Sequence, residues 1–364
     1  MSNDPIVCPF CPLCCDDLRV DPISGETDVP CHVAQVAFAS AIRPPSARLE
    51  SQPIETINWD ALRQSLSLKT PPVVDFIGAT IAEAKTLDAM VKRGQIRLRI
   101  DRDASARSLD QTIARDGLLG TTLGDAVRRA EYAWVIGNPD HATPRLKERL
   151  NQSGLAIEYT PSPGIALLSR LHELLRRETS DAEGEPCAAA SEADRLHEHF
   201  RHSRSTVVVV GDAPFEPGEE TIASELLLRW IAGWNESALP IGSGDDPIVS
   251  RVTLLRLTAD QNLHTVMRWR NNHVSESELS QPPRPAIRIG TRLSGSLSAV
   301  SLQIGGPDPG ESIAKAYLPA AVPGVHHADT TIRGDGSVTL PLAGLTTSPH
   351  PSRIEVLQRV LGAV

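Results

Sequence analysis

Short apolar runs alternate with amphipathic stretches along most of the chain. The run PPVVDFIGA at 71–79 predicts a buried strand, and 80–93 carries helical periodicity. The same pair returns as TVVVVGD at 206–212 and the helical stretch 219–234. Further strands are expected at 96–101, 132–137, 156–161, 252–257, 286–290 and 300–306, and further helices at 122–130, 144–152 and 351–364. Strands that alternate with helices predict an α/β protein with doubly wound parallel sheets.

A polar, acidic and alanine-rich stretch, RRETSDAEGEPCAAASEAD at 176–194, interrupts the alternation. We interpret it as a surface excursion or a connection between domains. The predicted organisation is a small Cys-rich N-terminal segment (1–50), a first α/β lobe (51–175), a polar connection (176–204), and a second α/β lobe with the C-terminal region (205–364). The histidine-rich stretch at 197–204 is expected to be a solvated surface.

The amino-acid composition and net charge of the chain exclude several classes of protein. With 364 residues, 40% of them hydrophobic, the chain can build a proper core and needs no disulfide scaffold. A formal charge of −9 argues against non-specific nucleic-acid binding. No apolar run reaches the ~20 residues that span a bilayer, and no signal-peptide pattern opens the chain. We therefore expect a cytoplasmic protein with no nucleic-acid or membrane partner.

The cysteines are crowded at the N-terminus. The thiols that we assign to one site are Cys8, Cys11, Cys15 and Cys31. The first three read C-x2-C-x3-C, with Pro9 and Pro12 favouring the turns between them, and the fourth precedes a helix-like run at 32–42. In a reducing compartment this pattern is more typical of a metal site than of disulfides. Four thiolates suit a [4Fe–4S] cluster or zinc.

The predicted geometry can be checked directly. The four sulfurs should lie about 4 Å apart around zinc, or about 6–7 Å apart around a cubane, with Cys14 pointing away from them. The open alternative is a set of thiols that simply pack in the core or stay without a metal.

A second candidate site follows the predicted strand at 132–137. Asn138 and His141 come directly after it, at the end where doubly wound folds place ligands. His141 is a candidate contact for a phosphate, a coenzyme or a partner chain, or a loop histidine satisfied by the backbone. Asn138 shapes the turn in either case. The adjacent His326 and His327 are expected to be structural or interfacial, since no ligand spacing surrounds them.

Two segments resemble a known family. The stretch 121–150 resembles the helix, strand and Asn-Pro loop of the B subunit of formylmethanofuran dehydrogenase, a member of the molybdopterin oxidoreductase superfamily. The stretch 316–345 resembles the late region of the same protein, where an Ala-Val-Pro-Gly turn precedes Thr-x-x-Arg-x-Asp-Gly. The N-terminal cysteine motif matches that family's cluster-binding segment in order and position. The resemblance implies two lobes of molybdopterin-oxidoreductase type.

One departure from the family bears on function. The full dehydrogenase chain ligates tungsten or molybdenum through a cysteine or selenocysteine, whereas the corresponding stretch 97–120 contains neither. No cysteine occurs between Cys31 and Cys187. This pattern resembles the shortened bacterial B subunit of the formyltransferase/hydrolase complex, which implies that molybdopterin or tungstopterin has been lost.

That resemblance implies partners and a role. The chain would be a structural subunit in tetrahydromethanopterin-linked C1 metabolism, assembled with A, C and D subunits. Its zinc-carrying A subunit would release formate from a formyl-furan coenzyme. The arginine-rich stretch 93–107 is either a solvated or subunit-contacting face, or a hold on the glutamate-rich tail of that coenzyme. The alternatives are an active tungsten- or molybdenum-pterin subunit and an iron–sulfur electron carrier.

Overall fold

The computed structural model describes the following residues: 4–68, 71–99, 104–152, 154–179, 191–211, 213–241, 248–258, 261–269, 285–290 and 299–362. The chain divides into two compact units. Unit 1 combines Met1–Ile100 with Thr258–Val364, and unit 2 is the continuous stretch Asp101–Leu257. Among the described helices, none combines the length and the apolar character that crossing a bilayer requires.

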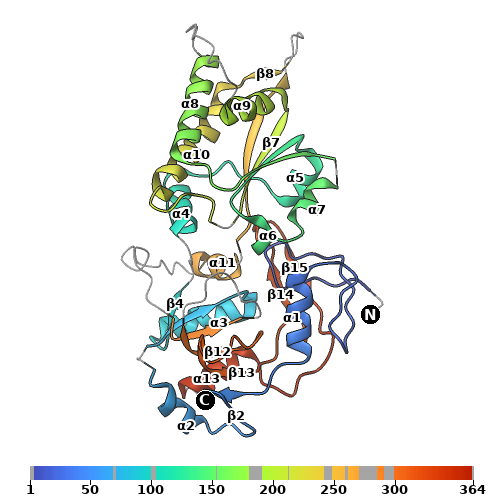
Figure 1. The fold of residues 1–364 in the computed structure, drawn as a ribbon, viewed down its shortest axis with the longest axis vertical. Coiled ribbons are helices and arrows are strands. Elements are labelled where there is room, and N and C mark those ends of the chain that lie inside the picture. Colours follow the sequence, from blue (N-terminus) through green and yellow to red (C-terminus); the bar gives the residue numbers. More distant parts are fainter. Residues whose placement is uncertain are drawn as a thin grey trace. The chain divides into compact units, whose positions relative to one another are not determined.

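Unit 1 is built on a mostly parallel sheet (Figure 1). Its strands, from edge to edge, are β2 (Gln52–Pro53), β1 (Arg48–Leu49), β13 (Ala314–Leu318), β12 (Val300–Ile304), β11 (Ile287–Ile289), β3 (Val73–Phe76) and β4 (Arg97–Arg99). The strands from β13 to β4 are parallel, while β1 pairs with both of its neighbours antiparallel. β3 therefore finds its partner β11 far along the chain, so that unit 1 closes only through long-range pairing.

Helices cover the apolar face of this sheet. They are α2 (Trp59–Leu66), α3 (Ile81–Lys92), α11 (Gln261–Trp269) and α13 (Arg353–Leu361). Their buried leucines and valines pack with Val74, Phe76 and Ile289 in one core cluster. The helices begin where the sequence supplies caps: the Thr80 side chain accepts the backbone N–H of Glu83, whose carboxylate in turn accepts the N–H of Thr80.

The N-terminal segment and a hairpin complete unit 1. Helix α1 (His32–Ile42) and the antiparallel pair of β14 (Asp329–Ile332) with β15 (Thr339–Leu342) belong to this unit. Residues 4–30 form a coil that is held by isolated bridges between Ile6 and Leu18 and between Val20 and Thr27. The expected small N-terminal segment is thus a layer on unit 1.

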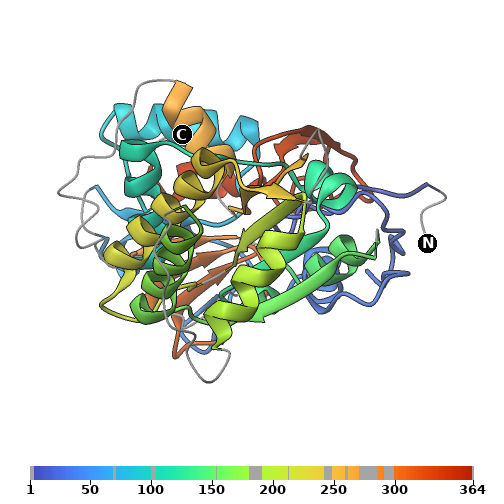
Figure 2. The same cartoon turned by 90° about the horizontal axis from the view of Figure 1, so that it is seen from above.

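Unit 2 has a fully parallel sheet in the order β10 (Arg251–Arg256), β7 (Ser205–Val210), β5 (Tyr132–Ile136), β6 (Ala156–Thr160). One face is covered by α4 (Ala104–Asp116), α8 (Ile165–Thr179), α9 (Glu192–His202) and α10 (Glu220–Ser237). Figures 1 and 2 show α5 (Leu123–Arg129) and α7 (Leu146–Asn151) on the opposite face. A small antiparallel pair, β8 (Pro240–Ile241) with β9 (Ile248–Val249), completes the described strands of this unit. The predicted α/β fold is confirmed, with helices on both faces here.

An aromatic cluster fills the core of unit 2. The ring centroids of Phe200 and Trp230 lie 4.8 Å apart, and those of Trp134 and Trp230 lie 6.2 Å apart. His197 packs edge-on against Trp234, with ring centroids 5.2 Å apart. The expectation of a solvated surface at 197–204 holds for His199 and His202, which are exposed, and is wrong for His197 and Phe200, because α9 turns these two side chains inward. The apolar spacing within α9 outweighs its polar composition.

The division into units differs from the predicted lobes. The predicted first lobe, 51–175, contains strands of both units, since β3 pairs in unit 1 and β5 in unit 2. Alternation of strands and helices does not reveal which strands pair across a long gap. Within the predicted polar connection, α8 continues to Thr179 and α9 begins at Glu192, and both pack in unit 2. Cys187 lies outside the described residues.

Candidate functional site

The cysteine loop at residues 8–15 folds back on itself. The Cys8 amide donates to the Cys15 carbonyl (N···O 2.7 Å), and the Cys14 amide donates to the Cys11 carbonyl (3.1 Å). Cys14 has a positive φ of 44°, a conformation that is costly for a residue with a Cβ atom. This turn lies between Cys11 and Cys15 and keeps both ends of the loop together.

Helix α1 brings the fifth cysteine to the same region. Cys31 is the N-cap residue of α1, in extended conformation and without a side-chain cap hydrogen bond. Phe10 of the cysteine loop packs edge-on against Phe38 of α1, with ring centroids 4.7 Å apart. The loop and the helix therefore share an apolar contact.

Burial and neighbouring thiols act together on Cys8 and on Cys14. Burial raises the pKa of Cys8 well above its usual value, and the nearby thiols of Cys11, Cys15 and Cys31 raise it further. Burial also raises the pKa of Cys14, and the nearby thiols of Cys11 and Cys15 raise it further, with smaller effects from Arg333 and Asp335. None of the five described cysteines forms a disulfide. Because metal binding requires thiolates, loading this region with a metal would have to release protons from buried thiols.

The residue types at this site suit a metal, but the positions of the side chains do not. The thiols of Cys11, Cys15 and Cys31 all lie close enough to act on the thiol of Cys8, as a four-thiolate site requires. Within the part of the chain that the structure describes, however, no three His, Cys, Asp or Glu side chains are spaced as ligands of one metal ion. The residue types fit a metal and the distances between them do not. The four-thiol site remains a prediction.

The cysteine loop packs against the two glycine turns of the 316–345 segment. A Cβ atom on Gly334 would lie 2.5 Å from the Pro12 Cβ, and one on Gly324 would lie 3.1 Å from the Pro9 Cγ. The Gly334 amide also donates to the Pro12 carbonyl (2.8 Å). Only glycine allows this close approach of the turns to the loop. Two of the three sequence segments that carry the resemblance thus meet in unit 1.

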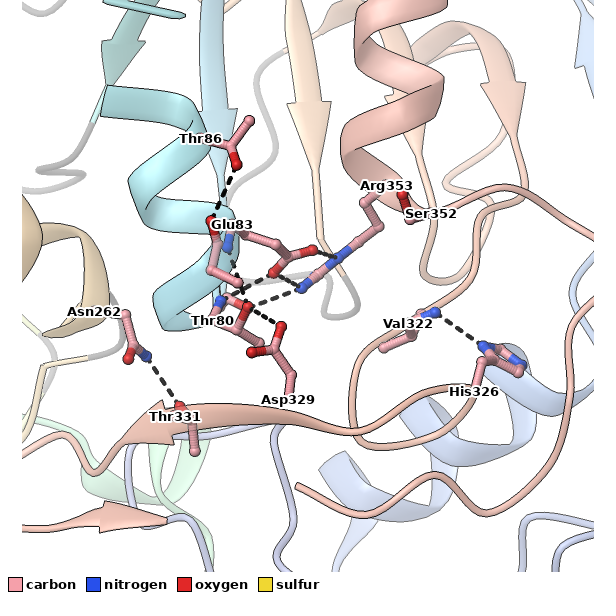
Figure 3. Close-up of polar contacts among 12 residues, drawn as sticks. Thr80, Glu83, Thr86, Asn262, Val322, His326, Asp329, Thr331, Ser352 and Arg353 are labelled. Atoms are coloured by element: carbon pink, nitrogen blue, oxygen red, sulfur yellow. Dashed lines mark hydrogen bonds and ion pairs between the residues drawn. The ribbon is translucent and has the colours of Figure 1, made fainter. Parts of the chain in front are cut away.

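A buried ion pair lies at the carboxyl end of β3, where α3 begins (Figure 3). Arg353 of α13, only 2% exposed, donates to both carboxylate oxygens of Glu83 with N···O distances of 2.5 and 2.9 Å. It also donates to the Gly78 carbonyl (3.2 Å), and its guanidinium lies 4.9 Å from the centre of the Phe76 ring. Such a buried bidentate pair is stable only when its remaining donors are satisfied.

Neighbouring polar groups extend this arrangement. The Thr80 hydroxyl donates to Asp329 of β14 (O···O 2.6 Å), and the Glu83 carboxylate accepts the Thr80 amide at the N-terminus of α3 (2.9 Å). Asn262 of α11 donates to the Thr331 hydroxyl (2.9 Å) on the same hairpin. The helix N-terminus, an ordinary anion-binding position, already holds the chain's own carboxylate.

The other strand ends of unit 1 are similarly filled. Gly290 follows β11, and a Cβ atom there would lie 2.7 Å from the Cβ of Ile77. Gly305 follows β12 and lies against the aliphatic part of Arg353. Ligands of doubly wound folds bind outside the carboxyl ends of the strands. At these three strand ends, side chains of this chain occupy the edge.

The structure places the remaining predicted residues separately. Asn138 is exposed in unit 2, at the N-cap of the short helix α6 (Pro139–Ala142), and its side chain makes no cap hydrogen bond. His141 belongs to α6, but its side chain lies outside the described part of the chain. His326 accepts a hydrogen bond from the Val322 amide through Nδ1 (2.8 Å), within unit 1. Burial lowers the pKa of His326 to about 4, with His327 and His350 adding to the shift, so this ring is neutral at pH 7.

The Arg353–Glu83 pair was not foreseen from the sequence. Its partners are 270 positions apart in the chain. The sequence does carry a signal for Glu83, because Thr80-x-x-Glu83 has the form of a capping box at the start of a helix. Nothing in the local sequence marks the arginine that follows Ser352 as buried.

The comparisons with known proteins bear on the fold. No family model and no curated protein matches the sequence. Among solved structures, the chain is similar to a chain from the crystal structure of the formyltransferase/hydrolase complex (FhcABCD) from Methylorubrum extorquens in complex with methylofuran. The match has a TM-score of 0.56 and 14% sequence identity, and it covers 87% of this chain and 98% of that chain. It shows that the two chains share a fold.

Proposed function

We propose that this chain is a structural, pterin-free subunit of a formyltransferase/hydrolase complex, in C1 metabolism linked to tetrahydromethanopterin. The observation that carries the proposal is the shared fold, which extends over 98% of a chain from such a complex. The resemblance of residues 121–150 and 316–345 to the B subunit of formylmethanofuran dehydrogenase supports the same assignment from the sequence. The protein's role is then to hold partner subunits of the A, C and D kinds together.

The filled sheet edge supports a non-catalytic role. A pterin or nucleotide phosphate at the carboxyl edge of unit 1 would need the α3 N-terminus, which the Glu83 carboxylate and Arg353 occupy. Displacing Glu83 would leave a buried guanidinium without its counter-charge, which is strongly unfavourable. The proposed loss of molybdopterin or tungstopterin is consistent with this packing.

The partner chains would perform the chemistry. In this proposal, an amidohydrolase-like A subunit releases formate from a formyl-furan coenzyme, and a D subunit exchanges the formyl group with tetrahydromethanopterin. The present chain contributes a fixed surface and contacts to the coenzyme's glutamate-rich tail. Exposed or half-buried arginines are suitable for that contact, since a guanidinium binds a carboxylate through two parallel hydrogen bonds.

A second candidate function rests on the thiols. The C-x2-C-x3-C spacing of Cys8, Cys11 and Cys15, with Cys31 near Cys8, would suit an iron–sulfur electron carrier or a zinc staple only if the thiols rearranged into a ligand set. A bound cluster would supply electron transfer, and a bound zinc ion would supply only cross-linking.

Co-expression with subunits of the A, C and D kinds tests the main proposal. We expect the four chains to elute together from a sizing column, and we expect formyl hydrolysis by the assembly to fall when this chain is omitted. The assembly should contain neither tungsten nor molybdenum by elemental analysis. Formate oxidation with an artificial electron acceptor, together with either metal and a pterin, would contradict the proposal. Iron with acid-labile sulfide would support the electron carrier instead.

A further inference from the structure

A rigid hairpin tip on unit 1 presents an apolar side chain to the outside. Ile23 is 74% exposed, more than any other large apolar residue among those described. The Asp21 carboxylate accepts the backbone N–H groups of Ile23 (2.7 Å) and Ser24 (2.9 Å), and the Gly25 amide donates to the Asp21 carbonyl (2.9 Å). These bonds fix the tip, so that Ile23 is displayed by a defined turn.

The hairpin is also locked onto helix α1. Gly25 lies so close to this helix that a Cβ atom there would be 2.7 Å from the Ala39 nitrogen. One turn earlier on the same helix, Val36 is 58% exposed. The eleven residues of α1, HVAQVAFASAI, include no Asp, Glu, Lys or Arg, although 22% of the whole chain is charged. Absence of charge on an exposed face is typical of the centre of a protein interface.

The hairpin segment that carries Ile23 is acidic: residues 16–30 contain five carboxylates and one cation, Arg19. Glu26 and Asp28 are exposed on the returning strand of the hairpin. Hydrogen bonds from the Ser24 and Ile23 amides lower the pKa of Asp21, so that its carboxylate stays ionised at neutral pH. An apolar centre with an acidic rim is complementary to an apolar pocket with a basic rim.

We propose that Ile23 and the exposed face of α1 form the surface by which this chain docks on a partner subunit, in an apolar pocket edged by Lys or Arg. The proposal rests on the proposed function as a subunit of a complex. A rigid tip loses little conformational entropy on binding, which favours Ile23 as the anchor. Apolar anchors that enter a dry pocket carry most of the energy of an interface, while rim charges mainly steer association.

The test uses the full chain and the co-expressed partner subunits. Ile23→Asp places a charge at the anchor, and Val36→Asp places one on α1. Ile222→Asp is the matched control, because Ile222 is also a largely exposed isoleucine (54%), on helix α10 of unit 2. We expect the first two variants to weaken assembly by about tenfold or more, the size of effect that loss of an anchor produces. The control should bind within about twofold of the wild type, as changes outside an interface do.

A variant of a rim carboxylate tests whether the acidic rim acts mainly on the rate of association. Glu26→Lys should slow association by about two- to fivefold and reduce its dependence on salt, with little effect on dissociation. Circular dichroism and thermal unfolding of each variant should match the wild type, since the altered side chains are exposed.

The possible failures are distinguishable. Assembly of Ile23→Asp with wild-type affinity overturns the docking surface and leaves the proposed function intact. If the wild-type chain binds no partner subunit, both proposals are wrong. If instead the wild-type chain forms a dimer of itself that Ile23→Asp abolishes while assembly persists, the surface serves a second copy and the docking proposal is overturned.

Discussion

The two units stabilise their sheets in different ways. In unit 2 every residue of β5 is buried, and β7 contributes a run of four buried valines, so both faces of the sheet centre are apolar. In unit 1, alternate positions form a buried polar row across four neighbouring strands. Its members are Asp75, Arg288, Gln303 and Tyr317, paired in register from β3 to β13. The stability of an apolar interior depends on how completely its volume is filled, whereas the stability of buried polar groups depends on whether each one has a hydrogen-bonding or charged partner. The stability of unit 2 should therefore be sensitive to changes in the size of its core side chains, and that of unit 1 to changes in the charge of its buried side chains.

Truncating a core tryptophan of unit 2 should have the largest effect. Trp230→Ala removes a fully buried ring from the aromatic cluster, and we expect a loss of about 4 kcal/mol in the free energy of unfolding. Ile222→Ala, on the exposed face of the same helix, should cost less than about 0.5 kcal/mol. Denaturant unfolding checks both values. Equal losses in the two variants would contradict the volume argument.

Breaking the Arg353–Glu83 ion pair of unit 1 should cause the second-largest loss of stability. Arg353→Met leaves the Glu83 carboxylate buried without its counter-charge, and we expect a loss of about 3 kcal/mol in the free energy of unfolding. Adding Glu83→Gln to the same chain should recover part of this loss, because the remaining amide is neutral. Denaturant unfolding of the single and double variants checks this. A double variant that is no more stable than Arg353→Met would show that the loss does not come from the unpaired charge of Glu83.

Acid should weaken unit 1 through His326. Its pKa is lowered to about 4 in the folded chain, against about 6.5 when unfolded. Below pH 6.5 the unfolded chain therefore binds the proton first, and stability falls as the pH drops from 6.5 towards 4. After allowance for partial exposure we expect a loss of about 1–2 kcal/mol. His326→Gln should flatten this part of the pH profile in unfolding measurements, and an unchanged slope would count against the assignment.

The smallest expected effect concerns the cap of α13. The Ser352 hydroxyl accepts the Glu355 amide, and the Glu355 carboxylate accepts the Ser352 amide (2.7 Å). Ser352→Ala should cost about 1 kcal/mol in the free energy of unfolding, whereas Ser352→Thr should be nearly neutral because threonine also caps. A larger loss on Ser352→Ala would mean that the cap also positions the neighbouring Arg353.

Local signals in the sequence located most of the strands and helices. The predicted strand at 206–212 and helix at 219–234 correspond to β7 and α10, because four consecutive valines and a long amphipathic run are unambiguous. The cysteine spacing predicted a four-thiolate site, and this stays a prediction because the spacing motif carries no information on sulfur distances. The pairing of β3 with β11 and of Glu83 with Arg353 depends on contacts between distant parts of the chain. Such contacts leave no local pattern, which is why the unit boundaries and the sheet-edge ion pair emerged only from the structure.

The split of unit 1 into two chain segments has a consequence for biosynthesis. Ribosomes make β3 and β4 before unit 2, and β11, β12 and β13 only after it. Until those later strands emerge, β3 has no partner on its β11 side, and its backbone hydrogen-bonding groups stay exposed. Unit 2, a continuous stretch, can fold while the chain is still being synthesised. The sheet of unit 1 can therefore close only after the chain has passed residue 318, so its early strands are the part of the nascent chain that stays open longest.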